Sequence, residues 1–494
     1  MKNAIFFNLP LTETGIPPAS VAALAPVFKS NNINLVLKDV NIDIVNSIDS
    51  VFYDTFWDWC QRTTTLTADN KLKLINWIDV YLDSVEPGTD LFAISVFSIY
   101  SVSFATIFLE RLKIKFPNTP RLVGGNGVSS NLGTETHNKT YGEFLLAHDM
   151  ADNVIFGEGE IALDHFLKNL TYPGINKNNP VQIENLDLLP ASDFSMVNFD
   201  QYHSRRLLIT GSRGCVRKCT FCDIENTWPK FQHRSPENIL NEIIKNKLEY
   251  GISQFEFTDS LINGSISSWI KFNDLLANAK QKDRDLQDIT YSGQFICRQE
   301  SSHPKLMYEL MHHAGATQLT VGIESFSEKI RNLMKKKFSN KAIDYHLEQC
   351  GYWGIPNIFL MIVGYPGETA DDHQQNIDAL YKYQTFSDMG TIFMMRWGFT
   401  MHIYQDTQLY KQKNELGLIL NDNVEIDGFY TWVSSFDLSL DIVERIRRRV
   451  ELHELSYNLG YSQPNTYSEL NSLKSLLKSY DSTTTKKLIQ MRTK

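Results

Sequence analysis

The chain has 494 residues, of which 42% are hydrophobic and 21% charged, and its formal net charge at pH 7 is −9. This size suggests about two or three domains, and the acidic balance disfavours nucleic acid as a partner. No apolar run is long enough to cross a membrane and no charged-then-apolar leader opens the chain, so we expect a cytoplasmic protein without a membrane span. Six cysteines in so long a chain do not make a disulfide framework and fit a reducing compartment. The basic runs 335–337 and 447–449 are predicted to be solvated helix faces.

The first third of the chain alternates between strand-like and helix-like patterns. Apolar segments predict strands over residues 4–9, 33–40, 91–97, 121–123 and 153–156. Helical periodicity covers residues 17–29, 104–115 and the segment after residue 159. This alternation predicts an α/β domain over residues 1–170, with a Rossmann-like, doubly wound parallel sheet. The aromatic-rich stretch 50–87 is predicted to be a helical insertion that packs over the sheet.

Two glycine clusters follow predicted strands of this domain. They are Gly124-Gly125 and Gly157-Glu158-Gly159-Glu160. Ligands of doubly wound sheets bind outside the carboxyl ends of the strands, where glycine lets the backbone come close to a ligand. We therefore expect any ligand of this domain at that edge.

The polar residues 171–198 are predicted to be a linker, and residues 199–410 alternate again between strands and helices. Strands are predicted over residues 206–210, 255–257, 289–296, 318–323, 357–363 and 391–399. Six such units indicate a partial (β/α)6 barrel, whose chemistry gathers at the carboxyl ends of the strands. Residues 411–494 are predicted to form a small helical region, with a charged helix near 441–455 that could cover the open barrel edge and a mobile tail.

Three cysteines lie close together directly after the first barrel strand. They are Cys215, Cys219 and Cys222. Thiolates are soft ligands that suit iron–sulfur clusters or zinc. A structural zinc site would need a fourth ligand, and only His233 is near in the sequence. Three thiolates on a four-iron cluster would instead leave one iron open.

The Cys-x3-Cys-x2-Cys spacing, with Phe221 before the third cysteine, resembles the radical S-adenosylmethionine (SAM) superfamily. The segments Gly322–Ser325 and Gly364–Thr369 are similar to signatures of its methylthiotransferase-like and cobalamin-dependent branch. The resemblance implies a 4Fe-4S cluster whose open iron binds SAM. It also implies cleavage of SAM to a 5′-deoxyadenosyl radical, with an external one-electron donor such as flavodoxin or ferredoxin.

The resemblance also suggests which residues contact SAM. Glu324 is suited to the sugar hydroxyls, and Arg298 can bind the SAM carboxylate with two hydrogen bonds. Backbone at Gly364 could approach the adenosine, and Phe221 and Ser325 complete the predicted SAM contacts.

Five further residues of interest have structural alternatives. Asp259 and Gln294 are explained equally well by substrate contact or by structural hydrogen bonds. Cys60, Cys297 and Cys350 are predicted to be buried as small hydrophobic residues, although some radical SAM epimerases use an extra cysteine as hydrogen-atom donor.

Ser95-Val96-Phe97 followed by Gly124-Gly125 resembles the Ser-x-Leu and Gly-Gly pattern of cobalamin-binding domains, with Phe in place of Leu. The resemblance implies cobalamin contacts at Ser95, Gly124, Gly125, Gly157 and Glu158. The Asp-x-His-x-x-Gly motif that supplies a lower cobalt ligand in the mutases is missing, because the first loop reads Leu-Thr-Glu-Thr-Gly.

The sequence thus favours a radical SAM enzyme that performs cobalamin-dependent C-methylation of an unactivated carbon. The alternative is a radical SAM enzyme without functional cobalamin, such as a peptide epimerase or crosslinking maturase. The substrate, a small molecule or a peptide, cannot be read from the sequence. An RNA methylthiotransferase is disfavoured, since that family takes three further cysteines from its N-terminal domain and only Cys60 is available here.

Overall fold

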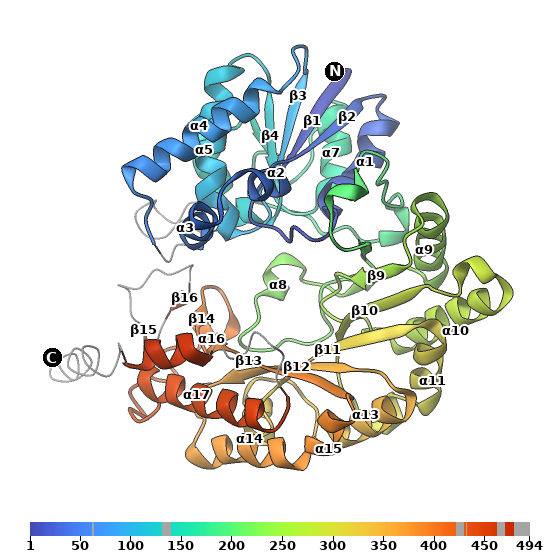
Figure 1. The fold of residues 1–494 in the computed structure, drawn as a ribbon, viewed down its shortest axis with the longest axis vertical. Helices are drawn as coiled ribbons and strands as arrows, with labels where there is room; N and C mark the ends of the chain where they lie inside the picture. Colours follow the sequence, from blue (N-terminus) through green and yellow to red (C-terminus); the bar gives the residue numbers. More distant parts are fainter. Residues whose placement is uncertain (62–63, 131–139, 421–428, 431, 462–469, 479–494) are drawn as a thin grey trace. The chain divides into compact units, whose positions relative to one another are not determined.

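The computed structural model describes residues 1–61, 64–130, 140–420, 429–430, 432–461 and 470–478 (Figure 1). The chain divides into two compact units, the first Met1–Leu208 and the second Ile209–Val424 with Phe429–Lys494. Each unit is built around a parallel β-sheet whose strands alternate with helices. Most of the predicted mobile tail lies outside the described residues.

The first unit contains a five-stranded parallel sheet in the order β2-β1-β3-β4-β5. Its strands are β1 (Asn3–Asn8), β2 (Asn34–Asp39), β3 (Leu91–Ser95), β4 (Arg121–Gly124) and β5 (Asn153–Val154). Its helices are α1 (Ala19–Ser30), α2 (Val40–Ser47), α3 (Ser50–Cys60), α4 (Ala68–Asp83), α5 (Ile99–Lys115), α6 (Tyr141–Ala147) and α7 (Gly159–Leu167). The predicted Rossmann-like architecture is therefore confirmed.

Alternate side chains of the central strands enter two separate hydrophobic cores. Phe7 and Phe92 pack in the core that includes side chains of α3, α4 and α5, whereas Phe6 and Leu91 pack in the core formed with α1 and α7. Burial on both faces is typical of parallel sheets covered by helices on each side. The sheet is thus doubly wound, as predicted.

The aromatic-rich insertion forms α3 and α4 and is part of the first of these cores. Phe52 and Phe56 are buried there, and the ring of Phe56 meets that of Phe104 in α5 edge-on, with centroids 5.8 Å apart. The aromatic side chains at helical spacing therefore pack the helical layer, as their periodicity predicted.

A six-stranded sheet begins with β6 at the boundary of the two units and has its other strands in the second unit, and its strand order, β6-β9-β10-β11-β12-β13, follows the chain order. Its strands are β6 (Arg206–Ile209), β9 (Gln254–Phe257), β10 (Thr290–Phe295), β11 (Ala316–Glu324), β12 (Asn357–Val363) and β13 (Ile392–Thr400). The pairings from β9 to β13 are parallel. The connecting helices include α9 (Pro236–Tyr250), α10 (Ile266–Lys282), α11 (Lys305–Ala314), α13 (Asn340–Trp353) and α14 (Ala370–Lys382). This is the predicted partial (β/α)6 barrel.

Short elements occupy the connections between and after the barrel strands. They are β7 (Ser212–Arg213), α8 (Ile224–Thr227), β8 (Gln232–His233), α12 (Glu328–Leu333), α15 (Gln384–Asp388), β14 (Ile403–Tyr404), α16 (Gln408–Lys411), β15 (Leu418–Leu420), β16 (Phe429–Tyr430) and β17 (Trp432–Ser434). His233 pairs with Ser212 in the small β7–β8 ladder, and its side chain is exposed.

The C-terminal helix α17 (Ile442–Asn458) packs on β13, the last strand of the barrel sheet. The indole nitrogen of Trp397 in β13 donates to Ser456 Oγ at 2.6 Å. A C-terminal helix therefore packs against the edge strand of this sheet, and its coverage of the open edge stays a prediction. In the described part of the chain, no helix is long and apolar enough to cross a membrane.

Candidate active site

The cysteine loop leaves β6 through a turn that a buried carboxylate holds in place. Asp259, directly after β9, accepts hydrogen bonds from the backbone N–H of Gly211 (2.8 Å) and the hydroxyl of Ser212 (2.7 Å). Burial raises the pKa of Asp259 to about 6. These contacts favour the structural interpretation of Asp259, since its hydrogen bonds position the start of the loop.

The loop is then fixed from three sides through Thr220. The Thr220 N–H donates to the Met334 carbonyl at 3.1 Å, and the Leu409 N–H donates to the Thr220 carbonyl at 2.7 Å. The Thr220 hydroxyl lies 2.6 Å from the hydroxyl of Tyr365. The segments after β11, β12 and β13 therefore all hold the cysteine loop.

The three cysteines are free, partly exposed thiols. Burial raises the pKa of each, and the thiols of Cys215 and Cys219 contribute to raising the pKa of Cys222 to about 11, so the three lie within electrostatic reach of one another. Among the described residues, no group of three or more His, Cys, Asp or Glu side chains is arranged to hold a single metal ion. Thiolates are soft donors of the kind that hold iron–sulfur clusters.

Glu324 ends β11 beside this loop. Its backbone has a left-handed conformation (φ 67°) at a point where the pairing of β11 with β12 shifts register, and such irregularities re-aim side chains next to active sites. The Glu324 carboxylate accepts a hydrogen bond through Oε1 from Lys336 Nζ at 2.9 Å. Its second oxygen, Oε2, has no hydrogen-bond donor among the described residues, so it can accept one from a ligand.

Lys336 was not predicted as a site residue, and the prediction that residues 335–337 form a solvated helix face is wrong for it. Its side chain is buried, and the residue is only 8% exposed. Gly322 makes room for the pair, because a Cβ there would lie 2.5 Å from Glu324 Oε1 and 2.9 Å from Lys336 Nζ. The glycine of the Gly-x-Glu-Ser segment is the sequence signal that could have indicated a crowded position beside Glu324.

Arg298 lies after β10 and is half-buried. Its Nη2 donates to the carbonyls of Asn263 (3.2 Å) and Gly264 (3.3 Å). Its Nε is buried without a partner in the described structure. Burial and the nearby Arg217 lower the pKa of Arg298, whereas Cys215 opposes this. An unpartnered donor of a guanidinium near the cysteine loop suits an anionic ligand.

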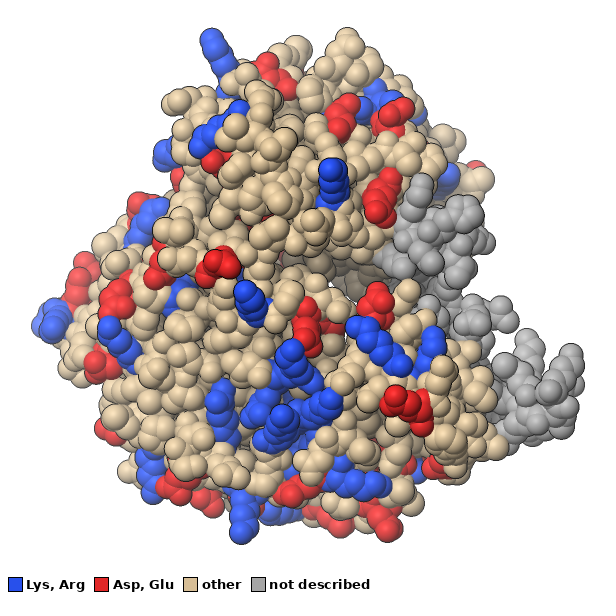
Figure 2. All heavy atoms as spheres, turned by 180° about the vertical axis from the view of Figure 1, so that it is seen from behind, with Lys and Arg blue, Asp and Glu red and all other residues tan. Residues whose placement is uncertain are grey.

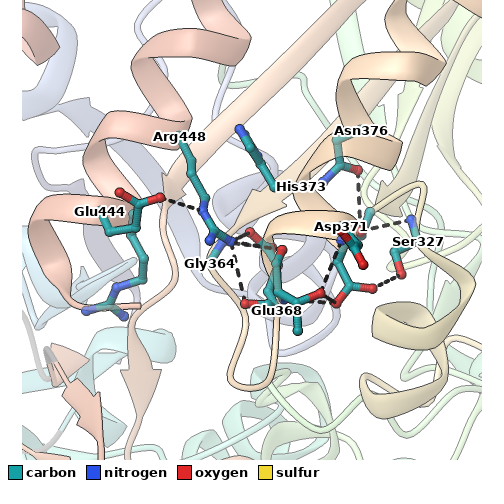
Figure 3. A network of polar contacts seen from close by, with 12 residues as sticks. Ser327, Gly364, Glu368, Asp371, His373, Asn376, Glu444 and Arg448 are labelled. Carbon is teal, nitrogen blue, oxygen red and sulfur yellow. Dashed lines mark hydrogen bonds and ion pairs between the residues drawn. The ribbon is translucent and has the colours of Figure 1, made fainter. Parts of the chain in front are cut away.

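The loop after β12 is held by a network that joins it to α14, α17 and the residues after β11 (Figure 3). Glu368 accepts hydrogen bonds from the Gly364 N–H at 3.1 Å and from Arg448 Nη1 at 3.0 Å. Arg448 also reaches Glu444 in its own helix at 3.0 Å. The basic run 447–449 is thus not simply a solvated face, since Arg448 is buried and paired with a buried carboxylate.

Gly364 itself has a positive φ of 78°, and a Cβ there would overlap the side chain of Arg445 in α17. Arg445 is fully buried, and its guanidinium donates to the carbonyls of Met401 and Trp432. The missing Cβ at Gly364 thus makes room for this arginine, and the predicted approach of its backbone to the adenosine of SAM stays a prediction.

The two remaining predicted SAM residues have structural contacts. Ser325 is fully buried, and its hydroxyl donates to Asn376 Oδ1 at 3.4 Å and accepts from the Ser327 N–H at 3.2 Å. Phe221 is partly buried and packs against the hydrophobic cluster that contains Met334 and Tyr365.

The other residues that the sequence singled out are distributed as follows. Cys60, Cys297 and Cys350 are all buried, as predicted for small hydrophobic residues. Cys350 lies 3.6 Å from Nε2 of His346, a buried histidine. Gln294 has an exposed side chain near the end of β10, which keeps substrate contact open for it.

In the first unit, the carboxyl ends of β1, β3 and β4 are in register. Ser95 is paired with Asn8 on one side and Gly124 on the other, and the strand order reverses between β1 and β3, the position where such sheets bind ligands. Gly125 has a φ of 100°, and a Cβ there would overlap the Val96 carbonyl. Ser95, Gly124 and Gly125 therefore lie together at this edge.

Gly157 and Glu158 contact the segment that follows α7. A Cβ at Gly157 would overlap Pro180, and the Glu158 carboxylate accepts a hydrogen bond from the Ile183 N–H. These two predicted ligand residues thus hold residues near 180 against the end of β5.

Residues 209–380 match the sequence profile of the Radical SAM superfamily. The chain is 24% identical over 233 residues to cytidylyl-2-hydroxyethylphosphonate methyltransferase of Streptomyces wedmorensis, covering 42% of this chain and 41% of that protein. It is 24% identical over 350 residues to tRNA-2-methylthio-N(6)-dimethylallyladenosine synthase of Sulfurihydrogenibium sp. (strain YO3AOP1), covering 68% and 74%. The chain thus spans less than half of the first relative.

Two solved structures match nearly the whole chain. The radical SAM methyltransferase TsrM from Kitasatospora setae, with tryptophan and a SAM analogue bound, matches with a TM-score of 0.65 and 15% identity over 94% of this chain and 90% of that chain. The cobalamin-dependent SAM radical enzyme OxsB, with aqua-cobalamin and SAM bound, matches with a TM-score of 0.62 and 17% identity over 97% and 71%. The profile match makes residues 209–380 a radical SAM domain, and the fold matches to TsrM and OxsB extend over both this domain and the Rossmann-like sheet that precedes it.

Proposed function

We propose that this protein is a radical SAM enzyme that performs cobalamin-dependent C-methylation of an unactivated carbon. The observation that carries the proposal is the fold match to TsrM and OxsB, which extends over both the Rossmann-like sheet and the barrel. In this proposal, residues 1–170 hold cobalamin, residues 199–410 hold the cluster and SAM, and residues 411–494 cover the barrel edge. The relative from Streptomyces, a methyltransferase, supports the same reaction class.

Cys215, Cys219 and Cys222 would bind the 4Fe-4S cluster, which with SAM supplies the 5′-deoxyadenosyl radical. Glu324 offers its free Oε2 to the sugar hydroxyls of SAM. Arg298 offers its unpartnered Nε to the SAM carboxylate. Ser325 and Gly364 would contribute to SAM binding through their backbone. The Ser325 hydroxyl is bonded to Asn376, and Arg445 fills the space beside Gly364.

Cobalamin, which would supply a methyl group, fits best at the carboxyl ends of β1, β3 and β4. Ser95, Gly124 and Gly125 lie there at the reversal of strand order. Gly157 and Glu158 would support this edge indirectly, because they hold the segment near Pro180.

The reaction requires one electron from an external donor, for which flavodoxin or ferredoxin is the proposed class. All six cysteines are free thiols, which supports a reducing compartment such as the cytoplasm. On the face shown in Figure 2, acidic and basic side chains are interspersed apart from one compact group of Lys and Arg. The net charge of −9 disfavours nucleic acid as the substrate, and a small molecule or peptide is proposed.

The test is anaerobic reconstitution of the wild type and of a variant in which Cys215, Cys219 and Cys222 are all changed to Ala. The wild type should hold about four irons and four sulfides per chain, the content of a cubane cluster, and should release 5′-deoxyadenosine from SAM when reduced. The variant should do neither, with Cys350→Ala as the matched control. Retained SAM cleavage in the triple variant would contradict the proposal.

The second candidate is a radical SAM enzyme without functional cobalamin, such as a peptide epimerase or a crosslinking maturase. It is favoured by the contacts of Gly157 and Glu158, which the protein uses for its own chain. If protein that is expressed with ample cobalamin is purified without it, that result would favour this second candidate. A methylthiotransferase like the Sulfurihydrogenibium relative remains disfavoured, because Cys60 is buried.

A further inference from the structure

The side chains of the barrel strands alternate between the two faces of the sheet, as they do in any β-strand. One face packs against the helices. The ring of Phe257 meets that of Trp269 in α10, with centroids 5.6 Å apart, and Trp397 of β13 bonds to α17. The residues that alternate with the buried ones point to the opposite, inner face of the sheet. On β10, β11 and β12 these residues are all partly or fully exposed, so the inner face is open to a ligand.

The chemical character of the inner face changes from strand to strand. On β10 and β11 it is polar, with the side chains of Ser292, Gln294, Gln318 and Thr320. On β12 it is apolar, with Ile358, Leu360 and Ile362, and Met394 continues this apolar strip on β13. The next inner residue of β13 is Arg396, which is exposed. A ligand of this face therefore meets hydrogen-bonding groups on one side and, on the other, an apolar strip that ends in a cation.

Arg396 projects from the inner face with its charge available. Its neighbours Met395 and Trp397 are buried on the helix side, so the Arg396 side chain points the other way. Within the described part of the chain, no ion pair or side-chain hydrogen bond joins its guanidinium to another group. Glu256, the acidic residue on the inner face of β9, lies at the far end of the strands β9 to β13. A guanidinium in this situation suits a carboxylate or phosphate, which it can bind with two hydrogen bonds.

Cross-strand pairing places Arg396 in the same row as the proposed SAM site. Gly322 pairs with Leu360, and Leu360 pairs with Arg396. The ion pair of Glu324 and Lys336 lies directly over Gly322, because a Cβ at Gly322 would lie 2.5 Å from Glu324 Oε1 and 2.9 Å from Lys336 Nζ. Neighbouring strands are about 4.8 Å apart, so about 10 Å separates the backbone at Gly322 from that at Arg396. One small molecule can span this distance.

We propose that Arg396 is a specificity-determining residue that binds an anionic group of the substrate, a carboxylate or a phosphate, while the apolar part of the substrate lies over Leu360 and Met394. The inference rests on the proposed function, since it takes Glu324 to mark the sugar of SAM. A substrate that is held at Arg396 and extends over Leu360 presents a carbon beside that sugar. The substrate class thus narrows to small molecules or peptides that carry an anionic group next to an apolar segment.

The experiment is isothermal titration calorimetry of the reconstituted, unreduced protein with SAM bound, which requires no turnover. The probes are phenylacetate, benzylphosphonate and the neutral isostere phenylacetamide. Wild type should bind at least one of the anions about tenfold or more tightly than the amide, and the anion that it prefers tells a carboxylate site from a phosphate site. Arg396→Met should reduce this preference at least tenfold, as expected for lost hydrogen bonds to a charged group. Arg396→Lys should retain part of it, because the charge remains and the two-pronged geometry is lost.

The matched control is Arg284→Met, because Arg284 is also an exposed arginine but lies before β10, at the amino ends of the strands. It should leave the affinities for all three probes within about twofold of wild type, since solvent screens distant exposed charges. A wild type that binds the anions no more tightly than the amide would overturn the inference, as would a preference that survives in Arg396→Met. Loss of SAM or cobalamin from Arg396→Met would also overturn it, because Arg396 would then hold a cofactor. A wild type that takes up no cluster would instead contradict the proposed function, and with it the basis of the inference.

Discussion

At the scale of single residues, Glu324 combines a structural and a chemical feature. Its positive φ and the register shift beside it turn the side chain at the strand end, and Lys336 holds one carboxylate oxygen while the other stays available. A carboxylate pre-oriented in this way loses little freedom when it accepts hydrogen bonds from a ligand.

Glu324→Gln should weaken SAM binding by about 1–3 kcal/mol, the range for a hydrogen bond to a charged group, because the amide keeps the shape and loses the charge. The measurement is the SAM dissociation constant of the reconstituted protein, with iron content and cluster absorbance unchanged. Glu328→Gln is the control, since Glu328 is an exposed acid nearby in the chain, at the start of α12. Equal SAM affinity in wild type and Glu324→Gln would show that Glu324 has a structural role alone.

Gly364→Ala should destabilise the protein by about 1–3 kcal/mol, because the new Cβ would overlap Arg445 and strain a backbone at φ 78°. Gly390→Ala separates the two causes: Gly390 has a similar φ of 75°, but a Cβ there meets nothing within 4 Å. The measurement is the midpoint of denaturant unfolding. A loss no larger than that of Gly390→Ala would mean that Arg445 moves aside.

At the scale of elements, Asp259 links β9 to the loop after β6. Its pKa rises from 3.8 to about 6 because burial penalises the charged form. A carboxyl group with a raised folded-state pKa favours the folded state fully below about pH 4 and loses that contribution as the pH rises through about 6.

Wild type should therefore lose stability relative to Asp259→Asn between pH 4 and pH 7, by up to roughly 3 kcal/mol for this change in pKa. The measurement is the unfolding midpoint of each protein at several pH values in this range. The difference between the two proteins removes the contribution of the titratable groups that they share. Parallel pH profiles would show that Asp259 titrates normally.

The strands and helices can be predicted from local sequence patterns, whereas the buried ion pairs near the site cannot. The strand predicted at 357–363 coincides with β12, and the strand predicted at 255–257 lies within β9. Lys336 and Arg448 were misread because their burial depends on partners that the local pattern does not reveal. Glu324 is 12 residues from Lys336, and Glu368 is 80 residues from Arg448.

The glycines illustrate the same limit. The backbone at Gly364 is predicted to approach the adenosine of SAM, and the structure adds that Arg445 of the C-terminal helix fills the space of its missing Cβ. Likewise, Gly157 is predicted to lie at a ligand edge, and Pro180 of the same chain lies where its Cβ would be. A positive φ or a missing Cβ can be read locally, and the partner comes from tertiary packing.

At the scale of the whole molecule, the proposed function depends on cobalamin in the first unit. The loop after β1 has no histidine, and its Thr12 is held by Asn41, whose side chain accepts from the Thr12 N–H and donates to the Thr12 carbonyl. His148 and His165 bond to carbonyls of their own helices, and His137 lies outside the described residues. The first loop therefore offers no imidazole to cobalt.

We predict that cobalamin binds with its dimethylbenzimidazole tail displaced towards Ser95 and the Gly124-Gly125 turn, and with no histidine in place of the tail. The lower face of cobalt would then carry water, another residue or nothing, and that position tunes how readily cobalt releases a methyl group. Electron paramagnetic resonance of the cob(II)alamin form checks this, and the cobalt lines should lack nitrogen superhyperfine splitting. A nitrogen triplet would contradict the prediction, and its loss in His148→Ala or His165→Ala would identify the ligand. Protein that retains no cobalamin at all would favour the enzyme without functional cobalamin.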